Sequence, residues 1–297
     1  MNWKGVLPAI TTPLREDLSV DHDSLAQHCQ WMLESGCTAI VAPGSLGEGA
    51  TLSTEEKIGV LRSCVKAVGG RAPVIAAISS LRTDRAAGFA GEAEKVGCNG
   101  LMVLPPYVYR GDWREMKVHV STVMKATALP VMLYNNPIAY GTDFLPEHIA
   151  ELAAEHKNLE AVKESSADAR RVSGIRAMLG DRLSVCVGVD DEILEGIGVG
   201  ATGWVAGLVN AFPVESVALF EAGIRNDRKR ADELYRWFLP LLRMDTVPKF
   251  VQLIKLVQQE VGRGSERVRP PRLPITGQER VKALGILREA LANRPKL

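Results

Sequence analysis

The sequence predicts an α/β protein built as a (β/α)8 TIM barrel with a C-terminal helical extension. Short apolar runs alternate with helix-length amphipathic segments eight times within about 210 residues, as the βα units of such a barrel do. Most runs are apolar throughout, which is typical of parallel strands that helices cover on both faces. An open, doubly wound sheet is the weaker alternative. The alternation ends after residue 212, so we expect the barrel over residues 1–224 and the extension over residues 225–297.

The individual elements follow from apolar periodicity and from turn and capping residues. The predicted strands are residues 6–10, 37–42, 73–79, 100–104, 130–134, 159–163, 183–187 and 202–206. The helices after the first seven strands are residues 21–35, 54–68, 83–96, 112–126, 145–156, 168–179 and 190–197. Ser53 and Glu56, for example, have the spacing of a capping box at the start of the second helix. After the eighth strand we expect helices at 214–223, 227–242, 247–261 and 278–292, with a proline-rich link at 268–274.

The composition limits the classes of partner. Of the 297 residues 46% are hydrophobic and 24% are charged, and the formal net charge is +1. Because the charge is near zero and no basic block occurs, nucleic acid and membrane are disfavoured and a small-molecule ligand is expected. No signal peptide or membrane span is recognisable, and the five scattered cysteines indicate a reducing, cytoplasmic location. The histidines lack metal-ligand spacing, so we expect no metal and no other cofactor.

Lys163 is the strongest candidate for chemistry. It ends the apolar run of the sixth predicted strand, and barrels carry their active sites at the carboxyl ends of their strands. Desolvation there would disfavour the ammonium form, so the amine could attack a carbonyl and form a Schiff base. Considered alone, a solvated lysine at a strand end is the more frequent case. Tyr134 and Tyr107 follow the fifth and fourth strands, and a phenol beside a cationic imine can transfer protons.

The loop after the second strand, Gly44-Ser45-Leu46-Gly47-Glu48, offers backbone N–H groups suited to a carboxylate. A tight turn that requires glycine is an equally good interpretation of this loop alone. We expect Glu48 to be a structural hydrogen-bond acceptor. Tyr109 and Tyr140 are expected only to pack loops. Gly188 would let a substrate lie against the backbone, and Asp190 is expected to cap the next helix.

Together, these motifs resemble the dihydrodipicolinate synthase and N-acetylneuraminate lyase superfamily of Schiff-base barrels over nearly the whole chain. The resemblance is carried by GSLGE, by Tyr-Asn-x-Pro at the fifth strand and by the lysine at the sixth. The N-terminal GVxPAxTTPL, LSxEEK after the glycine loop and the late VRPPxLP are also similar. Their order and their positions at the strand ends are specific to the superfamily.

The resemblance implies that Lys163 forms an imine with a 2-keto acid or cyclic imine. It implies that Tyr134 is the acid and base beside it, and that Ser45 links Tyr134 to Tyr107 in a proton relay. The residue matching Tyr107 comes from a neighbouring subunit in this family, so a homo-oligomer, a dimer or tetramer, is expected. The backbone at Ser45 and Leu46 would hold the substrate carboxylate. The expected substrate-binding residues are Gly44, Ser45, Leu46, Gly188 and Val205.

Two departures bear on the subgroup. Leu46 stands where the synthases and sialate lyases usually have a second hydroxyl, and Ala139 stands where the synthases have a carboxylate-binding arginine. GSLGE, YNNPIAYGTD, GWVAGLVNAFP and GRGSExVRPPRLP are instead similar to bacterial Δ1-pyrroline-4-hydroxy-2-carboxylate deaminases of hydroxyproline degradation. Three alternatives stay open: a 2-keto-3-deoxy sugar acid aldolase or dehydratase, a pyruvate-dependent 4-hydroxy-tetrahydrodipicolinate synthase, and a keto-acid sensor without turnover.

Overall fold

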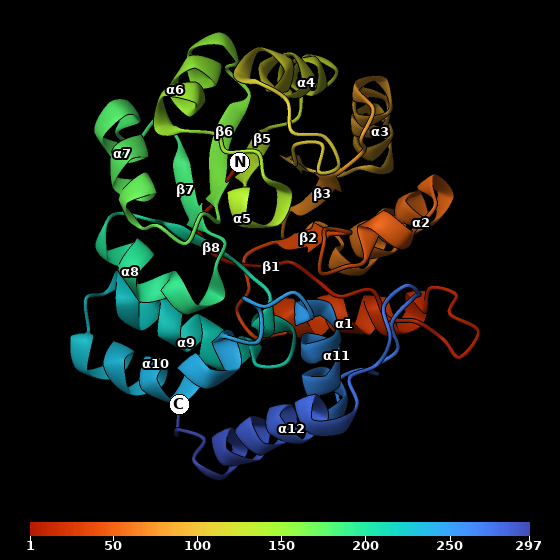
Figure 1. The fold of residues 1–297 in the computed structure, drawn as a ribbon, viewed down its shortest axis with the longest axis vertical. Helices are drawn as coiled ribbons and strands as arrows, with labels where there is room; N and C mark the ends of the chain where they lie inside the picture. The colour runs from red at the N-terminus through yellow and green to blue at the C-terminus, as the bar shows by residue number, and fades with distance from the viewer.

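The structure is a computed structural model that describes residues 1–297. Eight parallel strands form one sheet in the order β1-β8-β7-β6-β5-β4-β3-β2. The sheet closes on itself, because the N–H of Thr38 donates to the carbonyl of Val6 at 2.9 Å and that of Ile10 donates to Val41 at 3.0 Å. The fold is therefore the predicted (β/α)8 barrel (Figure 1). The strands are β1 (Gly5–Pro8), β2 (Ile40–Ala42), β3 (Val74–Ile78), β4 (Gly100–Val103), β5 (Val131–Asn135), β6 (Leu159–Glu164), β7 (Ser184–Val187) and β8 (Gly203–Ala206).

Helices surround the strands as a ring (Figure 1). They are α1 (His22–Glu34), α2 (Thr54–Val68), α3 (Thr83–Val96), α4 (Trp113–Lys125), α6 (Pro146–Glu155), α7 (Arg170–Leu179), α8 (Ile193–Gly198) and α9 (Pro213–Ile224). The predicted capping box is present, since the Ser53 hydroxyl accepts from the N–H of Glu56 and the Glu56 carboxylate accepts from that of Ser53. Short 3-10 turns η1 (Gly49–Thr51), η2 (Asp190–Glu192) and η3 (Leu208–Asn210) lie at strand ends.

One short helix was not expected. The single turn α5 (Pro137–Tyr140) follows β5 directly. Asn136 caps it by accepting from the N–H of Ala139 at 2.9 Å, and Pro137 occupies its first turn. The turn brings Tyr140 back over the end of β5.

The core consists of two apolar layers. One contains 14 buried residues, mostly from alternate positions of the strands, and fills the barrel interior. The other contains 68 buried residues and lies mainly between the strands and the surrounding helices. Because successive strand residues face opposite sides, Met132 and Ala161 in the interior layer place Tyr134 and Lys163 on the interior side too.

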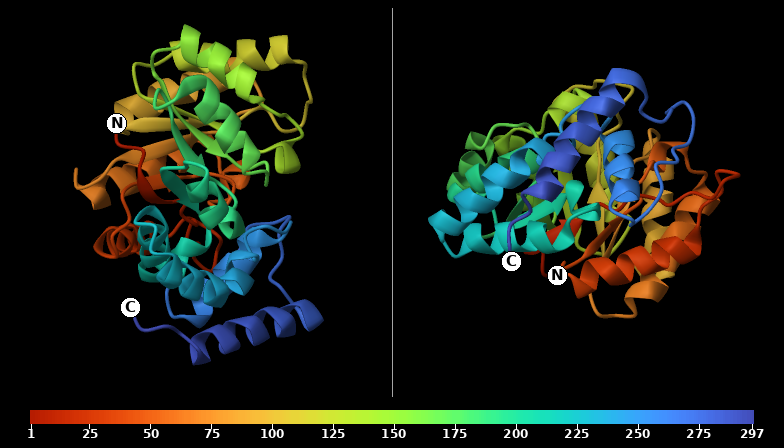
Figure 2. Two further views of the ribbon diagram at one scale, coloured as in Figure 1. Left: turned by 90° about the vertical axis from the view of Figure 1, so that its left-hand side faces the viewer. Right: turned by 90° about the horizontal axis from the view of Figure 1, so that it is seen from below.

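The remaining helices are α10 (Arg228–Leu242), α11 (Phe250–Glu260) and α12 (Gly277–Ala292). Residues 251–258 of α11 are all buried, so this helix is packed into the molecule on every side. Figure 2 shows α12 along the edge of the molecule, outside the helical ring. No helix combines the length and apolar character that a membrane crossing requires.

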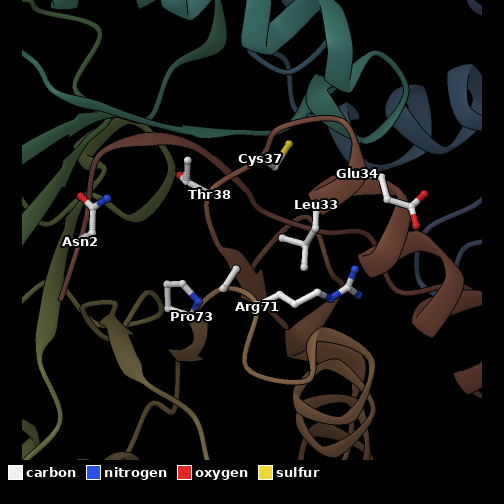
Figure 3. Close-up of a pocket in the computed structure, with 8 residues that line it drawn as sticks. Asn2, Leu33, Glu34, Cys37, Thr38, Arg71 and Pro73 are labelled. Atoms are coloured by element: carbon white, nitrogen blue, oxygen red, sulfur yellow. The ribbon is translucent and has the colours of Figure 1, made fainter.

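A hollow of about 480 Å³ lies at the amino ends of β2 and β3, as Figure 3 shows. It is lined by Asn2, Leu33, Glu34, Cys37, Thr38, Arg71, Ala72 and Pro73. Burial raises the pKa of the Cys37 thiol to about 12, so this thiol is not a nucleophile at neutral pH. Because barrels place their chemistry at the carboxyl ends of the strands, the active site is expected at the opposite end of the barrel.

Candidate active site

Lys163 lies on β6 with its side chain on the interior side of the barrel mouth. Neighbouring strands pair it with Tyr134 of β5 and Cys186 of β7. The residue is 6% exposed. Burial lowers the pKa of its amine, while Asp245, Tyr140 and Asp190 act in the opposite direction. Burial therefore favours the neutral, nucleophilic form of this amine.

Tyr134 is the immediate neighbour of this amine. The Nζ of Lys163 lies 4.3 Å from the centroid of the Tyr134 ring. The Tyr134 hydroxyl accepts a hydrogen bond of 3.0 Å from the Asn136 amide. Burial raises the pKa of the phenol, and the bond from Asn136 opposes that rise. A cation formed at Lys163 would favour the phenolate form of Tyr134.

Tyr140 occupies the position between Ser45 and Tyr134. Its hydroxyl forms a hydrogen bond with the Ser45 hydroxyl. Its ring meets Tyr134 edge-on at 5.7 Å and Tyr107 at a tilt at 6.0 Å. Tyr140 was expected only to pack loops, but its hydroxyl is the partner of the Ser45 hydroxyl within this chain. The relay from Ser45 to Tyr134 and Tyr107 stays a prediction, because the residue matching Tyr107 would come from a second subunit. The single-turn helix α5, which was not predicted, determines the position of Tyr140.

The glycine-rich loop holds its shape through tight backbone contacts. A Cβ atom on Gly47 would lie 2.9 Å from the carbonyl oxygen of Ile10, so only glycine fits there. The N–H of Glu48 donates to the carbonyl of Ser45 at 3.1 Å. No acceptor within the chain receives the N–H groups of Ser45 and Leu46. These two donors are therefore available for a ligand carboxylate.

Glu48 fastens this loop to the extension. One carboxylate oxygen lies 2.6 Å from the Nζ of Lys255 on α11, and the other accepts from the N–H of Arg269 at 2.9 Å. The side chains of Glu48 and Lys255 are 1% and 2% exposed. Lys255 also donates to the carbonyl of Arg267 at 2.6 Å. Glu48 is thus the structural acceptor that we expected.

The other predicted substrate-binding residues include Leu46, Val205 and Gly188. Leu46 is 4% exposed and packs in the outer apolar layer, whereas Val205 belongs to the interior layer. A Cβ on Gly188 would lie 2.5 Å from the Cε of Lys163. In this structure the space in front of Gly188 holds the Lys163 and Ser165 side chains, so the glycine gives Lys163 its room.

The expected role of Asp190 was wrong. It does not cap α8; its carboxylate accepts from the indole N–H of Trp204 at 2.9 Å and from the N–H of Leu208 at 2.7 Å. The N–H of Gly207 also donates to it, at 3.1 Å. Burial raises the pKa of Asp190 to about 6 against these hydrogen bonds. Because its carboxylate binds the N–H groups of Gly207 and Leu208, Asp190 holds the loop after β8 in place.

Asp245, at the end of α10, was not predicted from the sequence. The Asp245 side chain lies against Gly207, where a Cβ would be 2.6 Å from its Cγ. It thus reaches the carboxyl end of β8 from the extension. No apolar period or motif in the sequence marks it.

The described side chains give no cluster of three or more His, Cys, Asp or Glu residues suited to a metal ion. All five cysteines are buried and free. Burial raises the pKa of Cys186, the cysteine beside Lys163, to about 12. The amine of Lys163 accordingly remains the candidate nucleophile at this mouth.

Comparison with known proteins agrees with this geometry. The model of the dihydrodipicolinate synthetase family matches residues 2–290. The chain belongs to this family. It is 35% identical over 239 residues to a 4-hydroxy-tetrahydrodipicolinate synthase of Chelativorans sp., covering 80% of this chain and 82% of that protein. It is 32% identical over 291 residues to a protein of the same name from Geotalea uraniireducens, covering 97% and 98%.

The solved structures agree with the sequence comparison. A dihydrodipicolinate synthase from Aquifex aeolicus superposes with a TM-score of 0.91 at 28% identity, covering 98% of this chain and 97% of that one. The family consists of class I lyases that work through a Schiff base, and the chain is an enzyme of that class. This agrees with the buried lysine on β6.

Proposed function

We propose that this member of the family is a Schiff-base lyase and deaminase that converts Δ1-pyrroline-4-hydroxy-2-carboxylate and water into ammonia and 2-oxoglutarate semialdehyde. The observation that carries the proposal is the buried amine of Lys163, whose Nζ lies 4.3 Å from the Tyr134 ring centroid at the barrel mouth. The choice of substrate depends on the resemblance to the deaminases and on Ala139. No metal or redox group is needed for the chemistry, because the imine of Lys163 serves as the electron sink.

In the first step the neutral amine of Lys163 attacks C2 of the cyclic imine. The ring nitrogen leaves C2 by transimination, so the substrate stays bonded to Lys163 as a protonated imine and carries a free amine at C5. The lowered pKa of Lys163 favours this step, since only the unprotonated amine is a nucleophile. The free N–H groups of Ser45 and Leu46 would hold the C2 carboxylate meanwhile.

In the second step the protonated imine acidifies the hydrogens on C3. Tyr134 removes one of them, and the C4 hydroxyl leaves as water. Tyr140, hydrogen-bonded to Ser45 and packed against Tyr134, would pass protons between Tyr134 and the rest of the site. This role for Tyr140 would extend the relay through Ser45 that the resemblance implied.

In the last step the conjugated product tautomerises so that C5 becomes an imine. Water hydrolyses this imine and releases ammonia, and a second water hydrolyses the bond to Lys163 and releases 2-oxoglutarate semialdehyde. One water is lost from C4 and two are taken up, so the overall reaction consumes one water. The regenerated amine of Lys163 is then ready for another substrate.

A pyruvate-dependent 4-hydroxy-tetrahydrodipicolinate synthase is the second candidate, because relatives at 32% and 35% identity carry that name. Ala139 argues against it, since its side chain cannot bind a second substrate carboxylate as an arginine would. A charge-assisted contact of that kind contributes roughly 1.5–3 kcal/mol. A 2-keto-3-deoxy sugar acid aldolase or dehydratase would use the same lysine and tyrosine.

The test compares these reactions with one preparation of enzyme. Ammonia release from the hydroxy pyrroline is measured beside the pyruvate-dependent synthase reaction and beside cleavage or dehydration of a keto-deoxy sugar acid. We expect ammonia release to be the fastest, and to be absent in Lys163→Arg, which retains the positive charge but is not a nucleophile at neutral pH. If the synthase reaction or the sugar acid reaction is faster by a wide margin, the proposed substrate is wrong.

Borohydride treatment tests the class of protein. With the pyrroline or a keto acid present, reduction should attach the substrate to Lys163, as peptide mass mapping will show. If no adduct forms on Lys163 with any of these compounds, the Schiff-base role is refuted and a keto-acid sensor is the better description.

We also propose that the chain forms a homo-oligomer through the loops beside Tyr107. Val108, Tyr109 and Ile138 are 76%, 57% and 71% exposed on the loops after β4 and β5, an apolar surface suited to a second copy of the chain. Light scattering after size-exclusion chromatography should give a dimer or tetramer. A monomer at micromolar concentration would contradict this proposal.

A further inference from the structure

Ser165 carries a buried hydroxyl at the mouth of the barrel. It directly follows β6, and its N–H donates to the carbonyl of Asn135 at 2.8 Å, so the pairing of β6 with β5 continues through it. Because side chains alternate along a strand, Ser165 faces the same side as Lys163, two residues earlier. The residue is 1% exposed. The interior of the mouth therefore holds this hydroxyl on the same side as the amine.

The space in front of Gly188 shows that the two side chains meet. A Cβ atom on Gly188 would lie 2.0 Å from the Oγ of Ser165 and 2.5 Å from the Cε of Lys163. Both atoms thus border one small space, and Cε is the carbon that carries the reactive nitrogen. The Ser165 hydroxyl therefore lies beside the end of the Lys163 side chain, where a carbonyl carbon has to arrive.

This hydroxyl has no partner within the chain. Its Oγ is buried and forms no hydrogen bond. A buried hydroxyl without a partner destabilises a folded protein, so its presence calls for a reason other than stability. Ser166 and Thr202 carry similar hydroxyls, but Ser166 follows Glu164, whose carboxylate its N–H binds, and Thr202 precedes β8 at the other end of the barrel. Of these hydroxyls, Ser165 is the one beside Lys163.

Tyr134 provides a proton source next to Ser165. The Tyr134 hydroxyl accepts from the Asn136 amide at 3.0 Å, which leaves its own proton for another acceptor. Burial raises the pKa of this phenol, and Asn136 and Ser165 oppose that rise. The hydroxyls of Ser165 and Tyr134 are thus close enough to influence each other, although no hydrogen bond joins them in this structure. Ser165 is therefore a neighbour of both the nucleophile and the acid of the site.

We propose that the hydroxyl of Ser165 carries protons between Tyr134 and the atoms on C2 of the substrate while the bond to Lys163 is made and hydrolysed. The assignment rests on the proposed role of Lys163. With a keto acid, the neutral amine adds to C2 and a proton moves from the nitrogen to the oxygen. The C2–O bond then breaks as the nitrogen lone pair forms the C=N bond. The leaving oxygen takes the proton of Ser165 and departs as water.

Ser165 recovers its proton from Tyr134. Tyr134 is then left as the phenolate, which is the form that removes a hydrogen from C3 in the next step. With the cyclic imine the group that leaves C2 is the ring amine, and the same hydroxyl gives it the proton that it needs to leave. Hydrolysis runs through these transfers in reverse, so Ser165 serves both the first and the last step.

The test measures the rates of imine formation and hydrolysis, with labelled pyruvate as the probe. Borohydride added at increasing times after mixing traps the imine on Lys163, and a chase with unlabelled pyruvate gives the rate of hydrolysis. In Ser165→Ala we expect both rates to fall by about 100-fold, the lower end of what general acid–base catalysis supplies. The final amount of adduct should match the wild type, because a proton carrier speeds both directions by the same factor.

A matched variant and a stability measurement separate this role from a structural one. Ser166→Ala removes the next hydroxyl along the chain, which is also buried and without a partner but lies beside Glu164. Its rates should equal those of the wild type. Ser165→Ala should unfold at the same temperature as the wild type or higher, because it removes a buried hydroxyl that no group satisfies.

The possible outcomes distinguish this assignment from the proposed function. If the wild type forms no adduct with pyruvate or with the hydroxy pyrroline, the role of Lys163 fails and the proton carrier fails with it. If the wild type forms the adduct and the rates of Ser165→Ala lie within about threefold of it, the assignment of Ser165 alone is refuted. A smaller final amount of adduct with an unchanged rate of hydrolysis would show that Ser165 binds the keto acid and moves no proton. An equal loss of rate in Ser166→Ala would overturn the assignment as well.

Discussion

Replacing Glu48 by glutamine tests how the extension supports the glycine-rich loop. The change keeps the shape of the side chain and an acceptor for the N–H of Arg269, but it removes the charge that faces Lys255. The ammonium of Lys255 is then left with the carbonyl of Arg267 as its acceptor, at 2.6 Å, and with Arg272 nearby. Removing one partner of a buried ion pair strongly destabilises the folded state, because the other charge stays buried without compensation.

The expected magnitude follows from burial. Because the two side chains are only 1% and 2% exposed, water cannot replace the lost partner. Breaking such a pair lowers the free energy of unfolding by about 3–5 kcal/mol. Because Lys255 keeps its hydrogen bond to the carbonyl of Arg267, we expect a loss of about 3 kcal/mol. For a protein of this size that corresponds to a fall of roughly 5 °C in the unfolding temperature. The KM for the substrate should also rise, since the loop carries the N–H groups of Ser45 and Leu46.

Thermal unfolding of four proteins measures this effect: the wild type, Glu48→Gln, Lys255→Met and the double variant. We expect the double variant to be more stable than either single one, because it buries no unpaired charge. A surface pair, Lys95 with Glu92, provides the control, since Glu92→Gln should change stability by less than about 0.5 kcal/mol. A loss below about 1 kcal/mol in Glu48→Gln would refute the reasoning.

Three further predictions concern the site itself. Lys163→Ala should abolish turnover while leaving the fold intact by circular dichroism, and a wild-type rate would remove the nucleophile from the mechanism. Tyr140→Phe keeps the ring packing and loses the hydrogen bond to Ser45, so kcat should fall about 10- to 100-fold while borohydride still attaches pyruvate to Lys163. Asp190 has its pKa raised to about 6, above the ordinary 3.8, so its ionisation should destabilise the fold as the pH rises from 4 to 6. That contribution, about 3 kcal/mol, should be missing from the pH dependence of unfolding in Asp190→Asn.

The barrel could be predicted from the sequence because its signal is repeated and local. Each strand is an apolar run and several helices begin at a recognisable cap, as Ser53 with Glu56 shows for α2. Because side chains alternate between the two faces of β6, Lys163 lies on the interior side, and the pairing of β5 with β6 places Tyr134 beside it. Periodicity and strand order therefore predict that Lys163 and Tyr134 share one barrel mouth, whereas their expected roles come from the family resemblance.

The rest of the site depends on features that have no period. Tyr140 reaches Ser45 because Asn136 and Pro137 start a helix of a single turn, too short to leave an amphipathic pattern. Asp190 carries the residue type of a helix cap, but tertiary contacts with Trp204 and Leu208 determine where its carboxylate lies. Asp245 reaches the mouth only because α10 packs against the barrel and Gly207 leaves room for it. Such contacts arise from packing between distant segments.

The bond between Lys255 and Glu48 has a consequence for synthesis of the protein. The two residues are separated by 207 positions, and Asp245 is almost as far from the loop. By the time a ribosome makes α11, it has already made the segments that carry Ser45, Tyr134 and Lys163. The loop can take its final shape only after α11 arrives, so the nascent barrel should be catalytically silent until then.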